Sequence, residues 1–249
     1  MRHLPPLMSS GLAVALLLVV AVVVDHLAAL SQARQVTIAG VRAVVQLAAV
    51  GLVVAAVFRS PVLAPLYLLV VLSAASWTSG RRLGRDRRLV AIAACAISAG
   101  AAATAAIVFG TGALALSAQT SVPFVAQLVG GAMTATSLAG QRFTDDVNTG
   151  WAEIEGWLAI GATSSQAVEA MGRHAAARAL VPAIDQTRNV GLVVLPGAYV
   201  GLLLGGASPL EAGRIQLLVL VGLLAAETIA AVAVTRLLAP TLGALRPAC

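Results

Sequence analysis

The stretch IQLLVLVGLLAAETIAAVAVTRLL, residues 215–238, decides the fold class, because it is almost entirely apolar and holds a single acidic residue, Glu227. At about 1.5 Å per residue, a helix of this length crosses the roughly 30 Å hydrocarbon core of a bilayer. A helix also satisfies its own backbone hydrogen bonds, which an isolated strand in lipid cannot do. We therefore expect a membrane-spanning helix here.

Six more segments of similar character precede this one, at residues 7–24, 36–58, 62–77, 89–109, 122–139 and 187–204. The 249-residue chain is 59% hydrophobic and only 10% charged, with a mean hydropathy of +0.95, whereas a soluble domain has about 25% charged residues. These values exclude a soluble enzyme. They predict an all-α, polytopic membrane protein with about seven transmembrane helices in one domain, residues 1–249. A signal peptide is the alternative interpretation of 7–24.

The basic residues number 16, and all of them are arginine. Without a lysine the chain has no P-loop of its own and no Schiff-base lysine. The net charge of +6 is typical of membrane orientation rather than of nucleic-acid binding, so we expect no nucleic-acid partner.

Orientation follows from how the arginines divide between the loops. One side would carry Arg34, Arg81, Arg82, Arg85, Arg87, Arg88, Arg142, Arg173, Arg178, Arg236 and Arg246, and the other only Arg2, Arg59 and Arg214. The positive-inside rule then predicts an N-terminus outside the cell and a C-terminus in the cytoplasm.

The connection at residues 140–186 is much longer than the others and holds six of the ten acidic residues. Trp151, Ile154 and Leu158 share one face of a short amphipathic helix, which Gly161 would end. Thr163 or Ser164 can cap the helix that follows. The first helix could lie on lipid headgroups or dock a cytoplasmic partner, and its acidic residues favour a protein over an anionic leaflet.

Polar residues inside the expected spans are candidates for a transport pathway, because ionisable groups are costly there. Glu227 is the deepest carboxylate, Arg42 and Gln46 lie one turn apart in 36–58, and Gln127 lies in 122–139. Helix–helix packing for Glu227 and Gln127, and snorkelling for Arg42, are the alternatives.

The expected span 187–204 is interrupted by Pro196 and Gly197, and Asp185 and Arg188 can pair at its start. Broken helices of this kind often line a transport pathway, although a kink between packed helices is the alternative. The histidines and cysteines form no cluster at metal-ligand spacing, so a metal site stays unknown.

Several segments in order resemble the FetB-type (YbbM-like) permeases of ABC transporters, a family linked to iron export. They are VR at 41–42, QL at 46–47, GGAM at 130–133, QR at 141–142, RALVPAID at 178–185, VGLVVLPG at 190–197, GGASP at 205–209 and RIQ at 214–216. The family pattern has a methionine pair after the Leu-Pro-Gly and an Asn in the glycine segment, where this chain has Ala198, Tyr199 and Gly131.

The resemblance implies a permease subunit, without enzymatic activity of its own, that exports iron or another metal ion. It implies a separate FetA-like ATPase that holds ATP and Mg²⁺, and two permease copies; the chain itself would bind no cofactor. Residues 155–161 are also similar to the EAA loop of ABC permeases, so the implied coupling residues are Glu155, Trp157, Gly161, Ala162 and Thr163. The candidate pathway residues are Arg42, Gln46, Gln127, Met133, Asp185, Pro196, Gly197 and Glu227.

Two other functions fit the same residues. A proton-coupled secondary transporter would use Glu227 as its proton site, and a non-transporting scaffold would recruit a cytoplasmic protein through 140–186. The lack of lysine and the richness in Ala, Val, Leu, Gly and Arg indicate a GC-rich bacterial genome, hence the bacterial plasma (inner) membrane.

Overall fold

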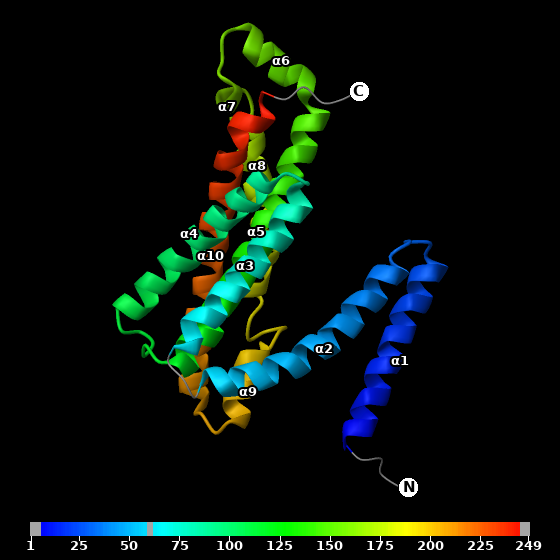
Figure 1. The fold of residues 1–249 in the computed structure, drawn as a ribbon, viewed down its shortest axis with the longest axis vertical. Helices are drawn as coiled ribbons and strands as arrows, with labels where there is room; N and C mark the ends of the chain where they lie inside the picture. The colour runs from blue at the N-terminus through cyan, green and yellow to red at the C-terminus, as the bar shows by residue number, and fades with distance from the viewer. Residues whose placement is uncertain (1–5, 59–61, 245–249) are drawn as a thin grey trace. The chain divides into compact units, whose positions relative to one another are not determined.

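The structure, a computed structural model, describes residues 6–58 and 62–244, apart from the side chains of residues 6, 7, 52 and 55. Arg2, Arg59 and Arg246 lie outside the described residues. The described elements are helices (Figure 1), and the pairing of Val190 with Val194 is an isolated bridge. The helices are α1 (Pro6–Leu27), α2 (Ala33–Val57), α3 (Leu63–Leu83), α4 (Arg87–Gly110), α5 (Ala118–Thr149), α6 (Trp151–Ala159), α7 (Ser164–Ala167), α8 (Glu169–Arg188), α9 (Gly197–Leu204) and α10 (Pro209–Leu242).

Five described helices, α1, α3, α4, α5 and α10, are long and apolar enough to cross a membrane. The all-α membrane fold class is therefore confirmed. The predicted span 36–58 also corresponds to a helix, α2, which has 25 residues and measures about 37 Å along its axis.

The prediction of a span at 187–204 is wrong in its bounds. Helix α8 ends at Arg188, an irregular segment follows, and α9 has only 8 residues. Gly191 takes a φ of +81°, and Pro196 has no N–H to donate. These two residues prevent one continuous helix.

The segment 140–186, which the sequence predicted to be one long connection, is helical at both ends. Helix α5 continues past residue 139 to Thr149, because no Gly or Pro follows Gly140 until Gly150. Helix α8 begins at Glu169. The true connection is therefore residues 150–168, which we call the tip.

The first compact unit, residues 1–60, is a hairpin of α1 and α2. Asp25 is only 4% exposed, and its carboxylate accepts hydrogen bonds from the backbone N–H groups of Gln32 (3.0 and 3.1 Å) and Ala33 (2.8 Å). The acidic side chain thus satisfies orphan donors at the start of α2 and closes the hairpin.

The second unit, residues 61–249, is a helical bundle in which α5 and α10 each pack against α4 and α8, and against each other. Two clusters of buried side chains form its core, one around Phe143 and Ile154 and one around Ile97 and Leu128. Figure 1 shows α5 and α10 running side by side from one end of this unit to the other.

Contacts between helices show which residues lie at the same height in this unit. A Cβ added at Gly140 of α5 would collide with Leu83 of α3 and lie 3.4 Å from Leu238 of α10. The α3–α4 turn, by which we mean residues 81–88 with their five arginines, therefore lies beside these two positions, and we call this the arginine end. At the opposite end, Arg214 donates to the carbonyl of Ala113. The division of arginines expected for Arg214 and the α3–α4 turn is thus present in the fold.

Candidate functional site

The tip is fastened to the bundle by the apolar face that the sequence predicted. Ile154 is fully buried, and Trp151 and Leu158 are half-buried against the core cluster around Phe143. The helix α6 therefore packs on its own protein with this face, and its other face is exposed.

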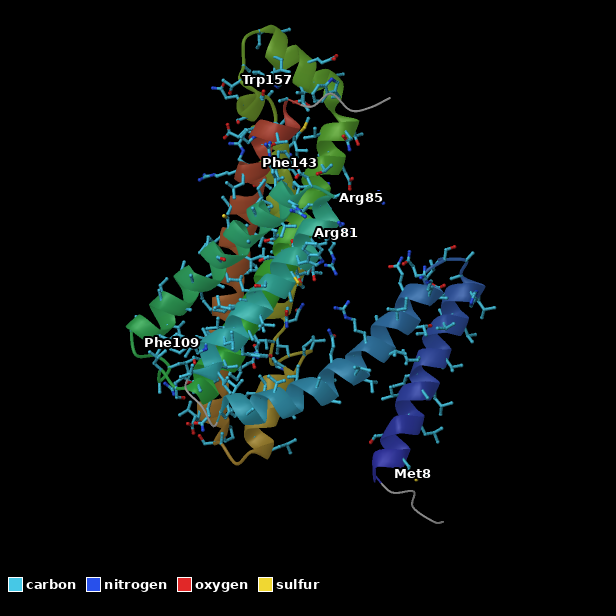
Figure 2. The ribbon with its side chains drawn as sticks, viewed as in Figure 1. Met8, Arg81, Arg85, Phe109, Phe143 and Trp157 are labelled. Atoms are coloured by element: carbon cyan, nitrogen blue, oxygen red, sulfur yellow. The ribbon has the colours of Figure 1, made fainter. Side chains whose placement is uncertain are left out.

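The tip projects beyond the arginine end. From Gly140 to Thr149, α5 continues for about 14 Å past the level of the α3–α4 turn. Figure 2 shows Trp157 at the far end of the unit, beyond Arg81 and Arg85. Helix α6 therefore lies beyond the level of the arginine end.

The outward side of α6 presents apolar surface next to carboxylates. Trp157 is 48% exposed and Ile160 is 76% exposed, and Glu153, one turn before Trp157, is exposed too. Glu155 is also exposed but lies next to Trp151, toward the packed face of the helix. The indole Nε1 of Trp151 donates to Glu155 Oε1 at 3.0 Å, which orients that carboxylate. An exposed aromatic with a charged rim has the composition of a protein-binding surface.

The end of α6 is a defined turn. Gly161 has a φ of +92°, a conformation that favours glycine, and the Ala162 N–H donates to the carbonyl of Trp157 at 3.1 Å. Thr163 caps α7 in a capping box with Gln166, as its predicted capping role requires. The five residues expected to couple, Glu155, Trp157, Gly161, Ala162 and Thr163, therefore lie together on the tip.

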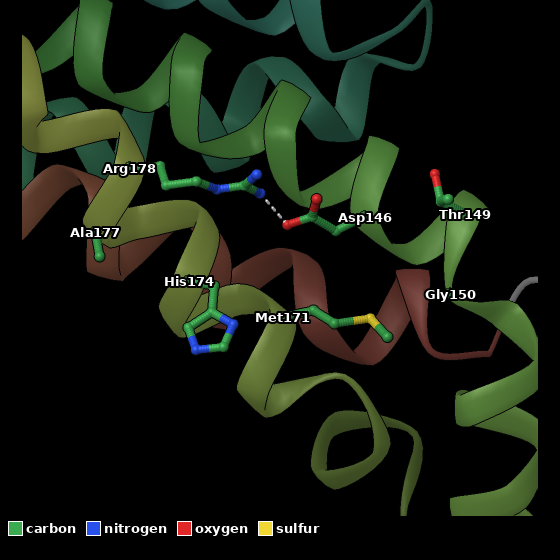
Figure 3. A pocket seen from close by; sticks show the side chains of 7 residues that line it. All are labelled: Asp146, Thr149, Gly150, Met171, His174, Ala177 and Arg178. Carbon is green, nitrogen blue, oxygen red and sulfur yellow. Dashed lines mark hydrogen bonds and ion pairs between the residues drawn. The ribbon is translucent and has the colours of Figure 1, made fainter.

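A groove of about 600 Å³ lies between α5 and α8 beneath the tip (Figure 3). Arg178 of α8 and Asp146 of α5 form an ion pair along it, and His174 and Met171 also line it. The ion pair joins two helices that both lead from the tip into the bundle.

A second polar site lies in the span region, where Glu227 of α10 faces α5. A Cβ added at Gly131 would lie 2.6 Å from Glu227 Oε1 and 2.7 Å from a methyl carbon of Leu223. The glycine thus leaves the room that this carboxylate occupies. Gln127, one turn away on the same face of α5, is exposed.

Helix α8 brings further polar groups to this depth. Its buried face is made of small residues, whereas His174, Arg178, Asp185 and Arg188 are exposed along one stripe of the other face. A Cβ at Gly172 would lie 3.5 Å from Thr235, and from this pair α10 runs about 12 Å to Glu227 and α8 about 20 Å to Asp185. Asp185 thus lies within about 8 Å of the depth of Glu227.

The remaining predicted pathway residues are dispersed. Arg42 and Gln46 are exposed on α2, in the first unit. Met133 is half-buried against the core cluster around Ile97. Pro196 is the N-cap of α9 and Gly197 its first residue, at the interruption that the sequence predicted.

Among the described residues, no group of three or more His, Cys, Asp or Glu side chains could hold a metal ion. Two features of the site were absent from the sequence reasoning, the Asp146–Arg178 pair and the packing of Gly131 on Glu227. The residues of each pair are far apart in the sequence and on different helices, so no local spacing signals them.

Comparison with known proteins extends over nearly the whole chain. The sequence profile of the Uncharacterised protein family (UPF0014) matches residues 8–242. The chain is 35% identical to the UPF0014 membrane protein STAR2 of Oryza sativa over 201 residues, which is 80% of this chain and 70% of the rice protein.

Two further relatives have names that refer to function. The Protein ALUMINUM SENSITIVE 3 of Arabidopsis thaliana is 32% identical over 80% of this chain and 74% of its own length. The probable iron export permease protein FetB of Escherichia coli is 29% identical over 90% of this chain and 88% of its own length. No solved structure matches the chain. With a family profile matching from α1 to α10, the chain belongs to the UPF0014 family of membrane proteins.

Proposed function

We propose that this chain is the permease subunit of an ABC transporter and that a separate FetA-like ATPase binds its tip. The observation that carries the proposal is the tip itself, a fastened helix that holds Trp157 and two carboxylates away from the arginine end. By the positive-inside rule this end faces the cytoplasm, where ATP and Mg²⁺ are available to the partner. In a bacterium the membrane would be the plasma membrane.

The solute would be a metal ion. Iron is the first candidate, because one relative is named a probable iron export permease. Glu227 supports a cationic solute, because it is a carboxylate at the middle of α10 with Gly131 opposite it. The exposed polar stripe of α8 would be unfavourable against lipid. Two permease copies would cover this stripe or enclose it in a water-filled pathway.

The tip is tested by association with a candidate FetA-like ATPase in lipid nanodiscs. We expect Trp157→Ala to weaken the association by roughly 30-fold, since buried aromatic anchors are worth about 2 kcal/mol at interfaces. Trp77→Ala is the matched control, because that tryptophan is 58% exposed but lies on α3. Equal binding by the two variants would remove the tip as the docking site.

The pathway is tested by ferrous iron transport with the ATPase in proteoliposomes. Glu227→Gln should lower transport by about tenfold without preventing assembly, because a carboxamide cannot balance the charge of a cation. Thr228→Val is the control, since that exposed hydroxyl is already bonded to the carbonyl of Leu224 at 2.7 Å. Unchanged transport in Glu227→Gln would exclude this carboxylate from the pathway.

A proton-coupled secondary transporter is the second candidate, favoured by the same carboxylate at mid-span. It needs no ATPase and would move its solute in liposomes under a pH gradient alone. Flux under that gradient without the partner, and no ATPase association, would favour it over the ABC permease.

A further inference from the structure

One face of α3 changes along its length from apolar side chains to an aromatic and then to a cationic side chain. Leu66, Val70, Ser73, Trp77 and Arg81 follow one another along a single stripe, and all five are exposed. The stripe runs for about 22 Å, which is the hydrocarbon thickness of one leaflet plus its headgroup region. The Ser73 hydroxyl donates to the carbonyl of Leu69 at 2.7 Å, so it presents no unsatisfied donor to an acyl chain.

The stripe ends at a dense group of positive charges in the α3–α4 turn, all of them exposed: Arg81, Arg82, Arg85, Arg87 and Arg88. The single acidic residue of the turn, Asp86, caps α4 by accepting from the Arg88 N–H at 3.0 Å. Within the described ranges 6–58 and 62–244, the ion pairs found join other residues, Arg173 with Glu169 and Arg178 with Asp146. The guanidinium groups of the turn are therefore available to an anion.

Trp77 joins the apolar and the charged parts of the stripe. The guanidinium of Arg81 lies over its ring, 5.4 Å from the ring centroid. A cation–π contact of this kind uses none of the guanidinium N–H groups as hydrogen-bond donors, so they can bind a phosphate with two hydrogen bonds. A tryptophan at the boundary between chain and headgroup is typical of membrane interfaces.

We propose that this face of α3 and the α3–α4 turn form a binding site for an anionic phospholipid. An acyl chain would lie along Leu66 and Val70, and the phosphate would bind Arg81 and Arg85, which Figure 2 shows at the same end of α3. The order apolar, aromatic, cationic is complementary to the acyl chain, the glycerol ester region and the anionic phosphate of such a lipid. A second copy is a poorer occupant, because two-fold symmetry would place one arginine turn against another.

The experiment measures contact between lipid and Trp77 in the full chain, in nanodiscs of phosphatidylcholine with increasing phosphatidylglycerol. The chain has 3 tryptophans, so Trp151→Phe with Trp157→Phe leaves Trp77 as the sole tryptophan, which is excited selectively over the tyrosines. Brominated acyl chains quench a tryptophan that they touch. We expect half-maximal quenching at a much lower mole fraction of brominated phosphatidylglycerol than of brominated phosphatidylcholine.

Adding Arg81→Gln and Arg85→Gln should weaken this preference by about 30-fold, at about 1 kcal/mol for each arginine near an anionic surface. Adding Arg173→Gln and Arg214→Gln instead removes the same charge from other places and should leave the preference unchanged. Equal quenching by both lipids in the parent, or equal loss in both double variants, would overturn the proposal. Absence of quenching by either lipid would show that a protein surface covers the face. The ATPase takes no part, so the result is independent of the proposed transport function.

Discussion

Two connections flank α8, the tip (residues 150–168) and residues 189–208, and they differ in how much of their side-chain surface is buried. Each contains short helical structure and glycine with positive φ: α6, α7 and Gly161 in the tip, and α9, Gly191 and Gly206 in residues 189–208. The tip buries Ile154 completely, whereas α9 buries no residue and Leu192 is 89% exposed. The tip is therefore held firmly by its packing, whereas residues 189–208 make little packing contact of their own.

The largest expected effect tests this contrast directly. Ile154→Ala should destabilise the tip by about 2–5 kcal/mol, because it removes a fully buried side chain from the core. Leu192→Ala should change stability by less than about 0.5 kcal/mol, since that side chain is exposed. Hydrogen exchange measured peptide by peptide would detect faster opening of residues 150–168 in the first variant only. Similar protection in both variants would contradict the contrast.

A smaller effect is expected when the N-cap residue of a helix in or after each connection is replaced. Thr163→Ala removes the cap of α7, and Ser208→Ala removes the side chain that accepts from the Glu211 N–H at the start of α10. Each should cost about 1 kcal/mol of helix stability. If the chain is the permease of an ABC transporter, as proposed, the Thr163 variant alone should lower solute-stimulated ATP hydrolysis by the partner ATPase. Loss of stimulation in the Ser208 variant as well would show that both connections transmit the motion.

The smallest effect concerns the ion pair beneath the tip. Arg178 and Asp146 are partly exposed, so a double-mutant cycle with Arg178→Gln and Asp146→Asn should give a coupling of about 1 kcal/mol or less. Thermal unfolding at low and high salt measures it, and the coupling should fall with salt. A coupling well above this range would mean that α5 and α8 are joined more firmly than their packing indicates.

Much of the fold could be predicted because lipid leaves few alternatives for an apolar chain. The predicted segment 89–109 lies within helix α4 (Arg87–Gly110), and the predicted segment 215–238 lies within helix α10 (Pro209–Leu242). The amphipathic face of α6 was also readable, since Trp151, Ile154 and Leu158 repeat at helical spacing. The extension of α5 to Thr149 was not, because hydropathy falls where a helix leaves the membrane while its backbone stays helical.

The error at 187–204 has a related physical cause. Apolarity is a signal of burial in lipid or protein, and residues 190–196 are apolar without being helical. Helix α8, by contrast, carries charges but packs along α5 and α10 through a face of alanines and one glycine, a pattern that a hydropathy window averages away.

The sequence by itself determined an all-helical membrane protein, its arginine-rich connections and the candidate tip, because these depend on composition and on periodicity over a few turns. Only the tertiary structure placed Asp146 on Arg178, Gly131 on Glu227 and Asp185 near the same depth as Glu227. Each of these depends on the height at which two helices distant in the chain pack together. That height is set by side chains such as Phe143 and Leu238, which meet only after the bundle has formed.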